Sequence, residues 1–148
     1  MAERADEVTR EMQAFARQVD VSDLTWERQR RQAALVLALC EMAERHGIDG
    51  VAMECWSLLP ERYGISGCQI VGQLCQRGLP CACEGDVLGA VTAVMMQAAA
   101  LDKEPVFFSD ITSRHPNKDN TELLWHCGPY PPSLAHPDTP PKSTFHGR

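Results

Sequence analysis

Several features that would assign the chain to a specialised class are missing from its sequence. No apolar run reaches the roughly 18 residues that a membrane-spanning helix requires. The first residues, MAERADEVTREM, are charged and contain no apolar core of a secretory signal. There is no GxGxxG or GxxxxGK(S/T) phosphate-binding loop and no internal repeat. The net charge is -6 and no segment is densely basic, so binding to a nucleic acid is not expected. With no membrane-spanning run and no secretory signal, the sequence predicts a cytoplasmic protein that does not bind a membrane.

The composition indicates one ordinary globular domain. The chain has 148 residues, of which 44% are hydrophobic and 23% charged, which is enough for one hydrophobic core. An odd number of cysteines, placed inside apolar runs, favours reduced and buried thiols over a disulfide framework. A zinc site remains an alternative, although the cysteine spacings lack the paired CxxC units of structural zinc sites. The seven cysteines are Cys40, Cys55, Cys68, Cys75, Cys81, Cys83 and Cys127.

The first third of the chain predicts two helices. Residues 2–19 are mostly polar with a weak apolar stripe, which is typical of a surface helix. A second helix is expected to begin after Thr25, a good N-cap, and to stop at Gly47, a residue suited to the position after a helix end. Residues 33–40 are apolar nearly all round, which predicts that this helix is buried against a sheet.

From residue 49 onward, strand and helix patterns alternate. Strands are expected at 49–56, 79–83, 105–109 and 122–125, and helices at 68–77 and 86–101. This alternation predicts an α/β fold, a parallel β-sheet flanked by helices in a Rossmann-like three-layer arrangement. We expect residues 1–130 to form a single α/β domain. Residues 131–148 are expected to be a proline-rich C-terminal tail with no packed element.

Polar residues stand where the four expected strands end. They are Glu54, Glu84, Asp110 and His126, and in a parallel sheet they would lie along one carboxyl edge, where open α/β sheets bind ligands. Three carboxylates and an imidazole at one edge suit a divalent cation such as Mn²⁺ or Mg²⁺. Less specific interpretations stay open, because an acid after a strand is often a helix cap, as expected of Asp86. Glu54 can equally be a surface residue, and His126 a satisfied, partly buried imidazole.

The same residues lie in segments that resemble a known enzyme family. The runs GVAMECWSLLP, CQIVGQLCQRGLPCACEGDVLGAVT, PVFFSDIT and LLWHCGPYPPSLA resemble the L-fucose isomerase family, within the fucose and arabinose isomerase group. The resemblance covers roughly residues 50–135 and looks like the middle domain of those longer enzymes. Its specific part is the pair CEGDVLGA and FFSDIT, separated by a helix-sized gap.

The resemblance implies a Mn²⁺-dependent aldose–ketose isomerase that acts on a small sugar through an ene-diol. It implies that Glu84 and Asp110 hold the cation and act as acid and base, and that His126 is an auxiliary ligand. Glu54 and Trp56 lie near a segment that looks like part of the sugar pocket. Relatives of this kind are oligomers, so a homo-oligomer is expected. The family's later metal-site histidine is absent, so little or no turnover is expected from this chain alone.

The resemblance leaves a second class of function open. A non-catalytic α/β module with the same fold would bind a sugar or a partner without a metal. The two interpretations differ in whether Glu84 and Asp110 together bind Mn²⁺.

Overall fold

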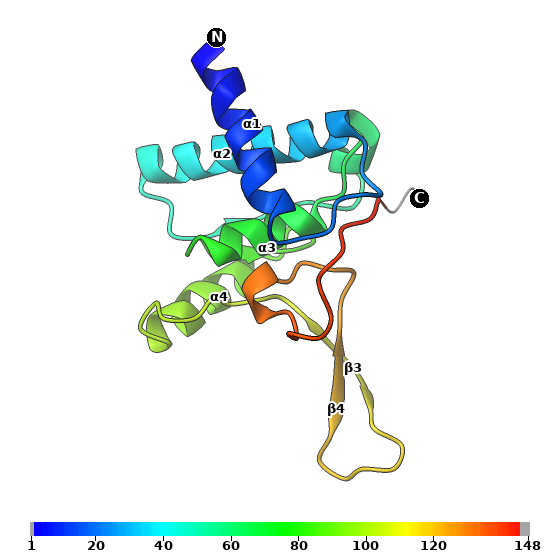
Figure 1. Ribbon diagram of the computed structural model, residues 1–148. Coiled ribbons are helices and arrows are strands. Elements are labelled where there is room, and N and C mark those ends of the chain that lie inside the picture. Colours follow the sequence, from blue (N-terminus) through cyan, green and yellow to red (C-terminus); the bar gives the residue numbers. More distant parts are fainter. Residues whose placement is uncertain (1, 146–148) are drawn as a thin grey trace.

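The computed structural model describes residues 2–145 and arranges them as stacked helices with two small sheets (Figure 1). Helix α1 crosses α2, α2 lies over α3, and α4 lies on the other side of α3 (Figure 1). A hairpin of β3 and β4 projects away from these helices. The elements are α1 (Ala2–Ala16), α2 (Trp26–His46), β1 (Val51–Ala52), a π-helical turn (Leu59–Tyr63), α3 (Cys68–Gln76), β2 (Cys81–Ala82), α4 (Val87–Ala99), β3 (Asp110–Arg114), β4 (Glu122–Trp125) and a 3₁₀ turn (Pro132–Leu134).

Helix α2 begins and ends where its sequence predicts. The Thr25 hydroxyl accepts a hydrogen bond from the Arg28 backbone N–H at 3.3 Å. Gly47 follows the helix with a φ of 62°, and its N–H donates to the Ala43 carbonyl. A left-handed residue at this position is favoured as glycine because it has no Cβ.

The apolar surface of α2 is wide because the helix packs against two partners. One side contacts α1 through Val8, Met12 and Ala33, and the other side contributes Val36 and Ala43 to the main core. The main core also holds Ile70 and other residues of α3 and β2, as well as residues near β1. The prediction that α2 is buried against a sheet is therefore wrong in its partner, because α2 packs on α1 and α3, with Gln32, Ala33, Val36 and Ala43 as its buried residues.

The parallel part of the predicted sheet consists of β1 and β2. Val51 pairs with Cys81 and Ala52 pairs with Ala82. Helix α4 contacts both strands and α3 contacts β2, so the pair lies among helices. The fold is therefore mixed α and β with a parallel two-stranded sheet. Among the residues described, no helix is long and apolar enough to cross a membrane.

The prediction of four parallel strands is wrong for the last two. Residues 105–109 form no strand, and β3 begins only at Asp110 and pairs antiparallel with β4. The short loop 115–121 explains this, because the His115 N–H donates to the Thr121 carbonyl at 2.8 Å and closes a hairpin. A parallel connection would need a crossover of about a dozen residues or more.

The proline-rich tail packs against the helices, contrary to the expectation that it would contain no packed element. Pro131 is fully buried, as is Pro129 just before the tail, and the 3₁₀ turn contacts α3. The Asp20 N–H donates to the Pro141 carbonyl at 2.9 Å, which joins the tail to the loop after α1. Proline rings lack an N–H but are apolar, so they can fill a groove without forming a regular element.

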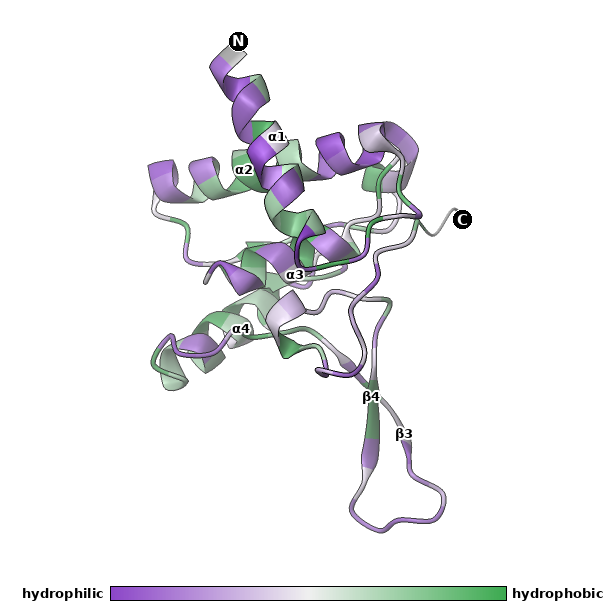
Figure 2. Ribbon diagram, in the orientation of Figure 1, coloured by the Kyte–Doolittle hydropathy of each residue, from purple (hydrophilic) through white to green (hydrophobic). Residues whose placement is uncertain are grey.

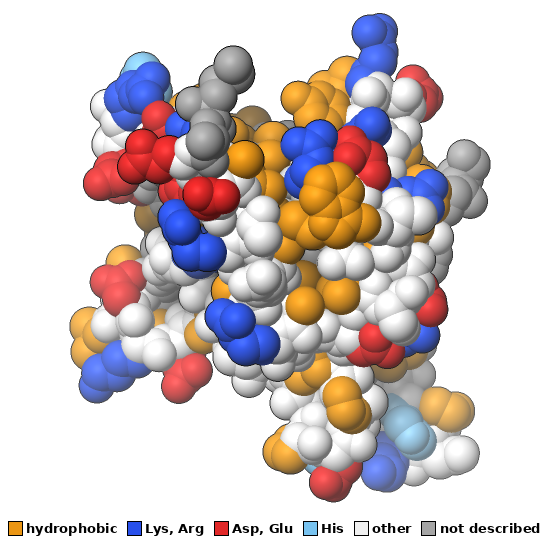
Figure 3. All heavy atoms as spheres, turned by 45° about the horizontal axis from the view of Figure 1, so that its top comes forward, with side chains coloured by type: hydrophobic (Ala, Val, Ile, Leu, Met, Phe, Trp, Pro, Cys, Tyr) orange, Lys and Arg blue, Asp and Glu red, His pale blue; other side chains and the backbone are white. Residues whose placement is uncertain are grey.

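On the face drawn in Figure 3, acidic and basic side chains are interspersed with apolar ones. Helix α4 and the hairpin loop differ sharply in hydropathy, since the helix is mostly hydrophobic and the loop hydrophilic (Figure 2). Exposed apolar side chains on α4 are Val87, Leu88, Val91, Met95 and Met96.

Candidate functional site

The turn after β1 is organised by Glu54. Its carboxylate accepts hydrogen bonds from the backbone N–H groups of Trp56, Ser57 and Leu58, each at 3.1 Å. These bonds, from Leu58 and Ser57 first, lower the pKa of Glu54. Both oxygens of this carboxylate are therefore engaged by its own loop, and its predicted contact with a sugar stays a prediction.

The turn after β2 places Glu84 in an unusual conformation. Glu84 has a φ of 60° and the following Gly85 a φ of 70°. The left-handed region costs a residue with a Cβ about 1–2 kcal/mol, so the surrounding structure must hold Glu84 there. Gly85 donates its N–H to the Met53 carbonyl at 3.0 Å, which fastens this turn to β1. Backbone strain of this kind is frequent at functional sites, but Leu101, Asp102 and Asn120 also have a positive φ, so it does not by itself identify Glu84 as a site residue.

Trp56 connects the two turns through its side chain. The indole Nε1–H donates to Glu84 Oε1 at 2.7 Å, and half of the Trp56 side chain is exposed. A hydrogen bond from an uncharged donor to a carboxylate fixes the direction of the carboxylate without neutralising it. Trp56 therefore contacts both Glu54, through its backbone N–H, and Glu84, through its indole, while the predicted sugar pocket at these residues stays a prediction.

Two cysteines lie buried at these turns. Cys55 Sγ and Cys83 Sγ are 2.8 Å apart, and the exposed fractions of the two residues are 6% and 0%. The hydrogen bond between them lowers the pKa of Cys55 to about 7, and the same contact together with burial raises the pKa of Cys83. This contact lies at the carboxyl ends of β1 and β2, which backbone hydrogen bonds such as Met53 N–H to the Ala82 carbonyl join.

Helix α4 begins at Val87, three positions after Glu84. The Asp86 carboxylate accepts a hydrogen bond from the Gly89 N–H at 2.8 Å, which confirms the predicted N-cap. The positive end of the α4 dipole therefore lies next to the Glu84 turn and favours the negative charge of a carboxylate there.

Replacing Asp86 with alanine tests how far this cap holds the turn. We expect Asp86→Ala to lower the free energy of unfolding by about 1 kcal/mol, because the first turn of α4 loses its side-chain acceptor. Urea unfolding followed by circular dichroism measures the change. Asp86→Asn keeps an acceptor and is expected to restore most of the loss, whereas equal losses for both variants would contradict a capping role.

Asp110 lies at the base of the hairpin. It is the first residue of β3, is exposed and pairs with Trp125 in the strand register. Two residues earlier, the Phe108 ring packs so closely on α4 that a Cβ at Gly89 would lie 2.7 Å from it. The segment that leads to Asp110 therefore passes the beginning of α4, near the turn that carries Glu84.

His126 is buried, with 7% of its surface exposed, and Phe108 packs edge-on against its ring. Its Nδ1 accepts the Cys127 backbone N–H at 2.9 Å, so in the neutral ring the proton is on Nε2. Among the described residues, this Nε2 has no hydrogen-bond partner. A metal ligand needs an unprotonated nitrogen, so His126 in this orientation does not fit a cation at Nε2.

The predicted cation site stays a prediction. Glu84 and Asp110 supply the oxygen ligands that Mn²⁺ and Mg²⁺ prefer. Within residues 2–145, no three His, Cys, Asp or Glu side chains form a group that could hold a metal ion. The structure thus does not gather Glu84, Asp110 and His126 into one shell, and the zinc alternative has no site in this part of the chain. All seven cysteines are free, as expected, and four of them are buried.

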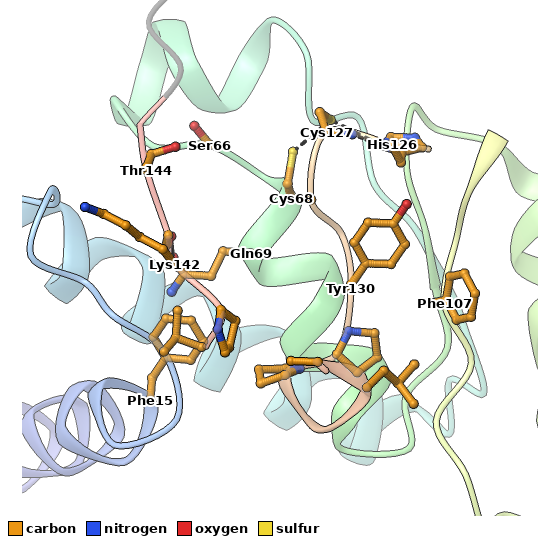
Figure 4. Close-up of a pocket in the computed structure, with 18 of the residues that line it drawn as sticks. Phe15, Ser66, Cys68, Gln69, Phe107, His126, Cys127, Tyr130, Lys142 and Thr144 are labelled. Atoms are coloured by element: carbon orange, nitrogen blue, oxygen red, sulfur yellow. Dashed lines mark hydrogen bonds between the residues drawn. The ribbon is translucent and has the colours of Figure 1, made fainter. Parts of the chain in front are cut away.

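A cavity of about 700 Å³ lies between α3, the base of the hairpin and the tail (Figure 4). Three of its polar atoms are buried without a hydrogen-bond partner in the described part of the chain: Gln32 Oε1, Ser66 Oγ and His126 Nε2. Unpaired buried polar atoms are costly, so a cavity of this kind favours water or a hydroxylated molecule. Sequence reasoning missed this cavity because its outer wall is the tail, which was not expected to pack.

Comparison with known proteins places this chain near one kind of enzyme. It is 33% identical over 105 residues to the sulfoquinovose isomerase of Clostridium sp. (strain MSTE9), covering 71% of this chain and 23% of the relative. It is 27% identical over 145 residues to that of Alkalicoccus urumqiensis, with coverages of 85% and 32%. For the enzyme of Priestia megaterium the identity is 29% over 92 residues, with coverages of 62% and 20%. The chain thus spans less than a third of each of these relatives.

No protein-family model and no solved structure matches the chain. The relatives are sugar isomerases, which agrees with the kind of enzyme that the resemblance implies. Their name points to sulfoquinovose rather than L-fucose, so the specific L-fucose isomerase family is not confirmed.

Proposed function

We propose that this chain is part of a metal-dependent aldose–ketose isomerase, with Glu84 and Asp110 as its catalytic carboxylates. The observation that carries the proposal is the Glu84 turn, where a glutamate is held in the left-handed region and is hydrogen-bonded by Trp56. The sulfoquinovose isomerase relatives support the reaction class and make sulfoquinovose or a similar sugar the proposed substrate. In the complete enzyme, β1 and β2 would belong to a larger Rossmann-like parallel sheet.

Glu84 and Asp110 would divide the proton transfers between them. One carboxylate removes the proton from the sugar carbon next to the carbonyl and returns it to the neighbouring carbon, through an ene-diol. The other moves the hydroxyl proton in the opposite direction. Glu84 and Asp110 would also hold a divalent cation, Mn²⁺, which when bound stabilises the negative charge on the ene-diol. The Trp56 indole N–H keeps Glu84 Oε1 in one direction, so the other oxygen of Glu84 is left for the reaction.

Trp56, His126 and the apolar face of α4 have further proposed roles in the same enzyme. The half-exposed Trp56 ring offers an apolar surface for the sugar beside Glu84. His126 would join the cation only after its ring turns away from the Cys127 N–H. The exposed apolar residues of α4 agree with the expected homo-oligomer, because such a face is stabilised when a second copy covers it.

A Mn²⁺ titration by calorimetry tests the proposal. We expect saturable binding to the wild-type chain, and at least a tenfold weaker affinity for the double variant Glu84→Gln, Asp110→Asn, a loss of about 1.4 kcal/mol. Mn²⁺ should also quench tryptophan fluorescence in the wild type, and less so in Trp56→Phe, because Trp56 contacts Glu84.

A matched control separates a site from general charge effects. The double variant Glu61→Gln, Asp119→Asn removes the same charge from two exposed acids elsewhere. It should bind Mn²⁺ as the wild type does. If the wild type shows no saturable binding, or if the control loses as much affinity as the test variant, the carboxylate pair is not a cation site.

The cavity behind His126 favours a second candidate, a module that binds a sugar or a partner without a metal. Among the described residues, Gln32 and His126 line this cavity with buried polar atoms that have no hydrogen-bond partner, whereas Glu84 and Asp110 do not line it. Sulfoquinovose binding that persists in EDTA and in the Glu84→Gln, Asp110→Asn variant would support this module over the isomerase.

A further inference from the structure

Two cysteines meet in the wall of the cavity. Cys68 is the first residue of α3, and Cys127 follows β4 by two positions. Their sulfurs are 3.1 Å apart although the residues are 59 positions apart in the chain. Both side chains are half-buried and both line the 700 Å³ cavity, as Figure 4 shows.

The other cysteines do not combine these properties. Cys55 and Cys83 are even closer, at 2.8 Å, but they are 6% and 0% exposed, and neither lines this cavity. Cys75 and Cys81 are each 1% exposed. Thiol–disulfide exchange needs an attacking sulfur that a second molecule can reach. Accessibility therefore distinguishes the Cys68–Cys127 pair from the closer, buried pair.

We propose that Cys68 and Cys127 form a dithiol site that reacts with low-molecular-weight disulfides such as oxidised glutathione. The Cys127 sulfur, after losing its proton, attacks one glutathione sulfur and forms a mixed disulfide. The first glutathione leaves as a thiolate and takes up a proton. Cys68 then loses its proton and attacks the Cys127 sulfur, and the second glutathione leaves as a thiolate and takes up that proton. Two protein thiols are oxidised to one disulfide while one glutathione disulfide is reduced to two thiols.

The geometry suits both steps. A disulfide bond is about 2.05 Å long, so the two sulfurs need to approach by only about 1 Å. A cavity of about 700 Å³ is within the usual range for small-molecule sites. Burial, together with the nearby Cys127 thiol, raises the pKa of Cys68 to about 12, so Cys68 is less suited than Cys127 to the first attack on glutathione disulfide.

The bond would change the surroundings of His126. It would join the start of α3 to the segment after β4, next to the buried imidazole, and close a long loop of the chain. In a reducing compartment the pair stays reduced and is oxidised only when small disulfides accumulate. This chemistry is independent of the proposed isomerase and of any cation.

The test treats the 148-residue chain with oxidised glutathione, then alkylates the remaining thiols and identifies them by peptide mass spectrometry. We expect two of the seven cysteines to become protected, joined as Cys68–Cys127 with no glutathione retained, while Cys55 and Cys83 stay alkylated. Cys68→Ser should stop at a mixed disulfide with one glutathione on Cys127. Cys127→Ser should leave Cys68 unreacted, and Cys40→Ser should behave as the wild type.

Three results would overturn the proposal. They are a disulfide mapped to Cys55 and Cys83, stable glutathione on Cys68 or Cys127 of the wild type without a bond between them, or a folded chain in which all seven thiols stay reactive. Circular dichroism of each variant shows whether it is folded. If a serine variant does not fold, the wild-type peptide map alone still shows whether Cys68 and Cys127 become joined.

Discussion

Replacing Leu74 with alanine is expected to lower the free energy of unfolding by about 2–5 kcal/mol. Leu74 lies in α3 with 0% of its surface exposed, inside the core cluster that α2, α3 and β2 share. Removing its side-chain carbons leaves a cavity that rigid neighbours fill only in part. Since domains of this size are typically stable by about 5–15 kcal/mol, the change is a large share of the total.

Leu88→Ala is the matched control for this prediction. Leu88 lies in α4, so both variants exchange the same two residue types within a helix, but Leu88 is 79% exposed. We expect its effect to be within about 0.5 kcal/mol of zero. Urea unfolding followed by circular dichroism measures both. If Leu74→Ala and Leu88→Ala lower the free energy of unfolding by similar amounts, α3 is not the centre of the core.

Local signals predicted the helices well. Thr25 and Gly47 mark the ends of α2, and Asp86 caps α4, because capping depends on residues only a few positions apart. The β1–β2 pair also agrees with the predicted parallel sheet. These features follow from short-range chemistry that a single sequence displays.

Long-range pairing was predicted less well. The pattern in residues 105–109 is apolar enough for a strand, but the structure uses Val106 and Phe108 to pack on the core without a strand partner. The loop 115–121 is too short for a parallel crossover, and that signal was available in the sequence. The packed tail was less predictable, because nothing local shows that Pro129 and Pro131 would fill a groove on α3.

For the site, the sequence could predict residue types but not their hydrogen bonds. An acid after a strand and the CEGDVLGA motif led to Glu84, and the structure adds its left-handed conformation and its bond to Trp56. Loop geometry determines that three backbone N–H groups donate to Glu54. It also determines which nitrogen of His126 carries the proton. The Cys68–Cys127 contact joins segments 59 positions apart, which no spacing rule reveals.

Gly72→Ala is expected to displace the tail and to destabilise the chain by about 1–3 kcal/mol. A Cβ at Gly72 would lie 2.5 Å from the Tyr130 carbonyl oxygen and 2.9 Å from its carbon. Both are backbone atoms, which cannot turn aside as a flexible side chain can. Alanine is favoured over glycine in a helix by about 1 kcal/mol, so a net loss means that the steric clash exceeds this gain.

Limited trypsin digestion shows whether the tail is the part that moves. Lys142 lies in the tail and forms an ion pair with Asp23 at 3.0 Å, so cleavage after Lys142 should become faster when the tail leaves α3. Lys118 lies in the hairpin loop, and its cleavage rate is an internal control that Gly72→Ala should leave unchanged. Faster cleavage at both sites would indicate general unfolding. A stabilised variant with unchanged cleavage would mean that Gly72 is not needed for the close approach of the tail.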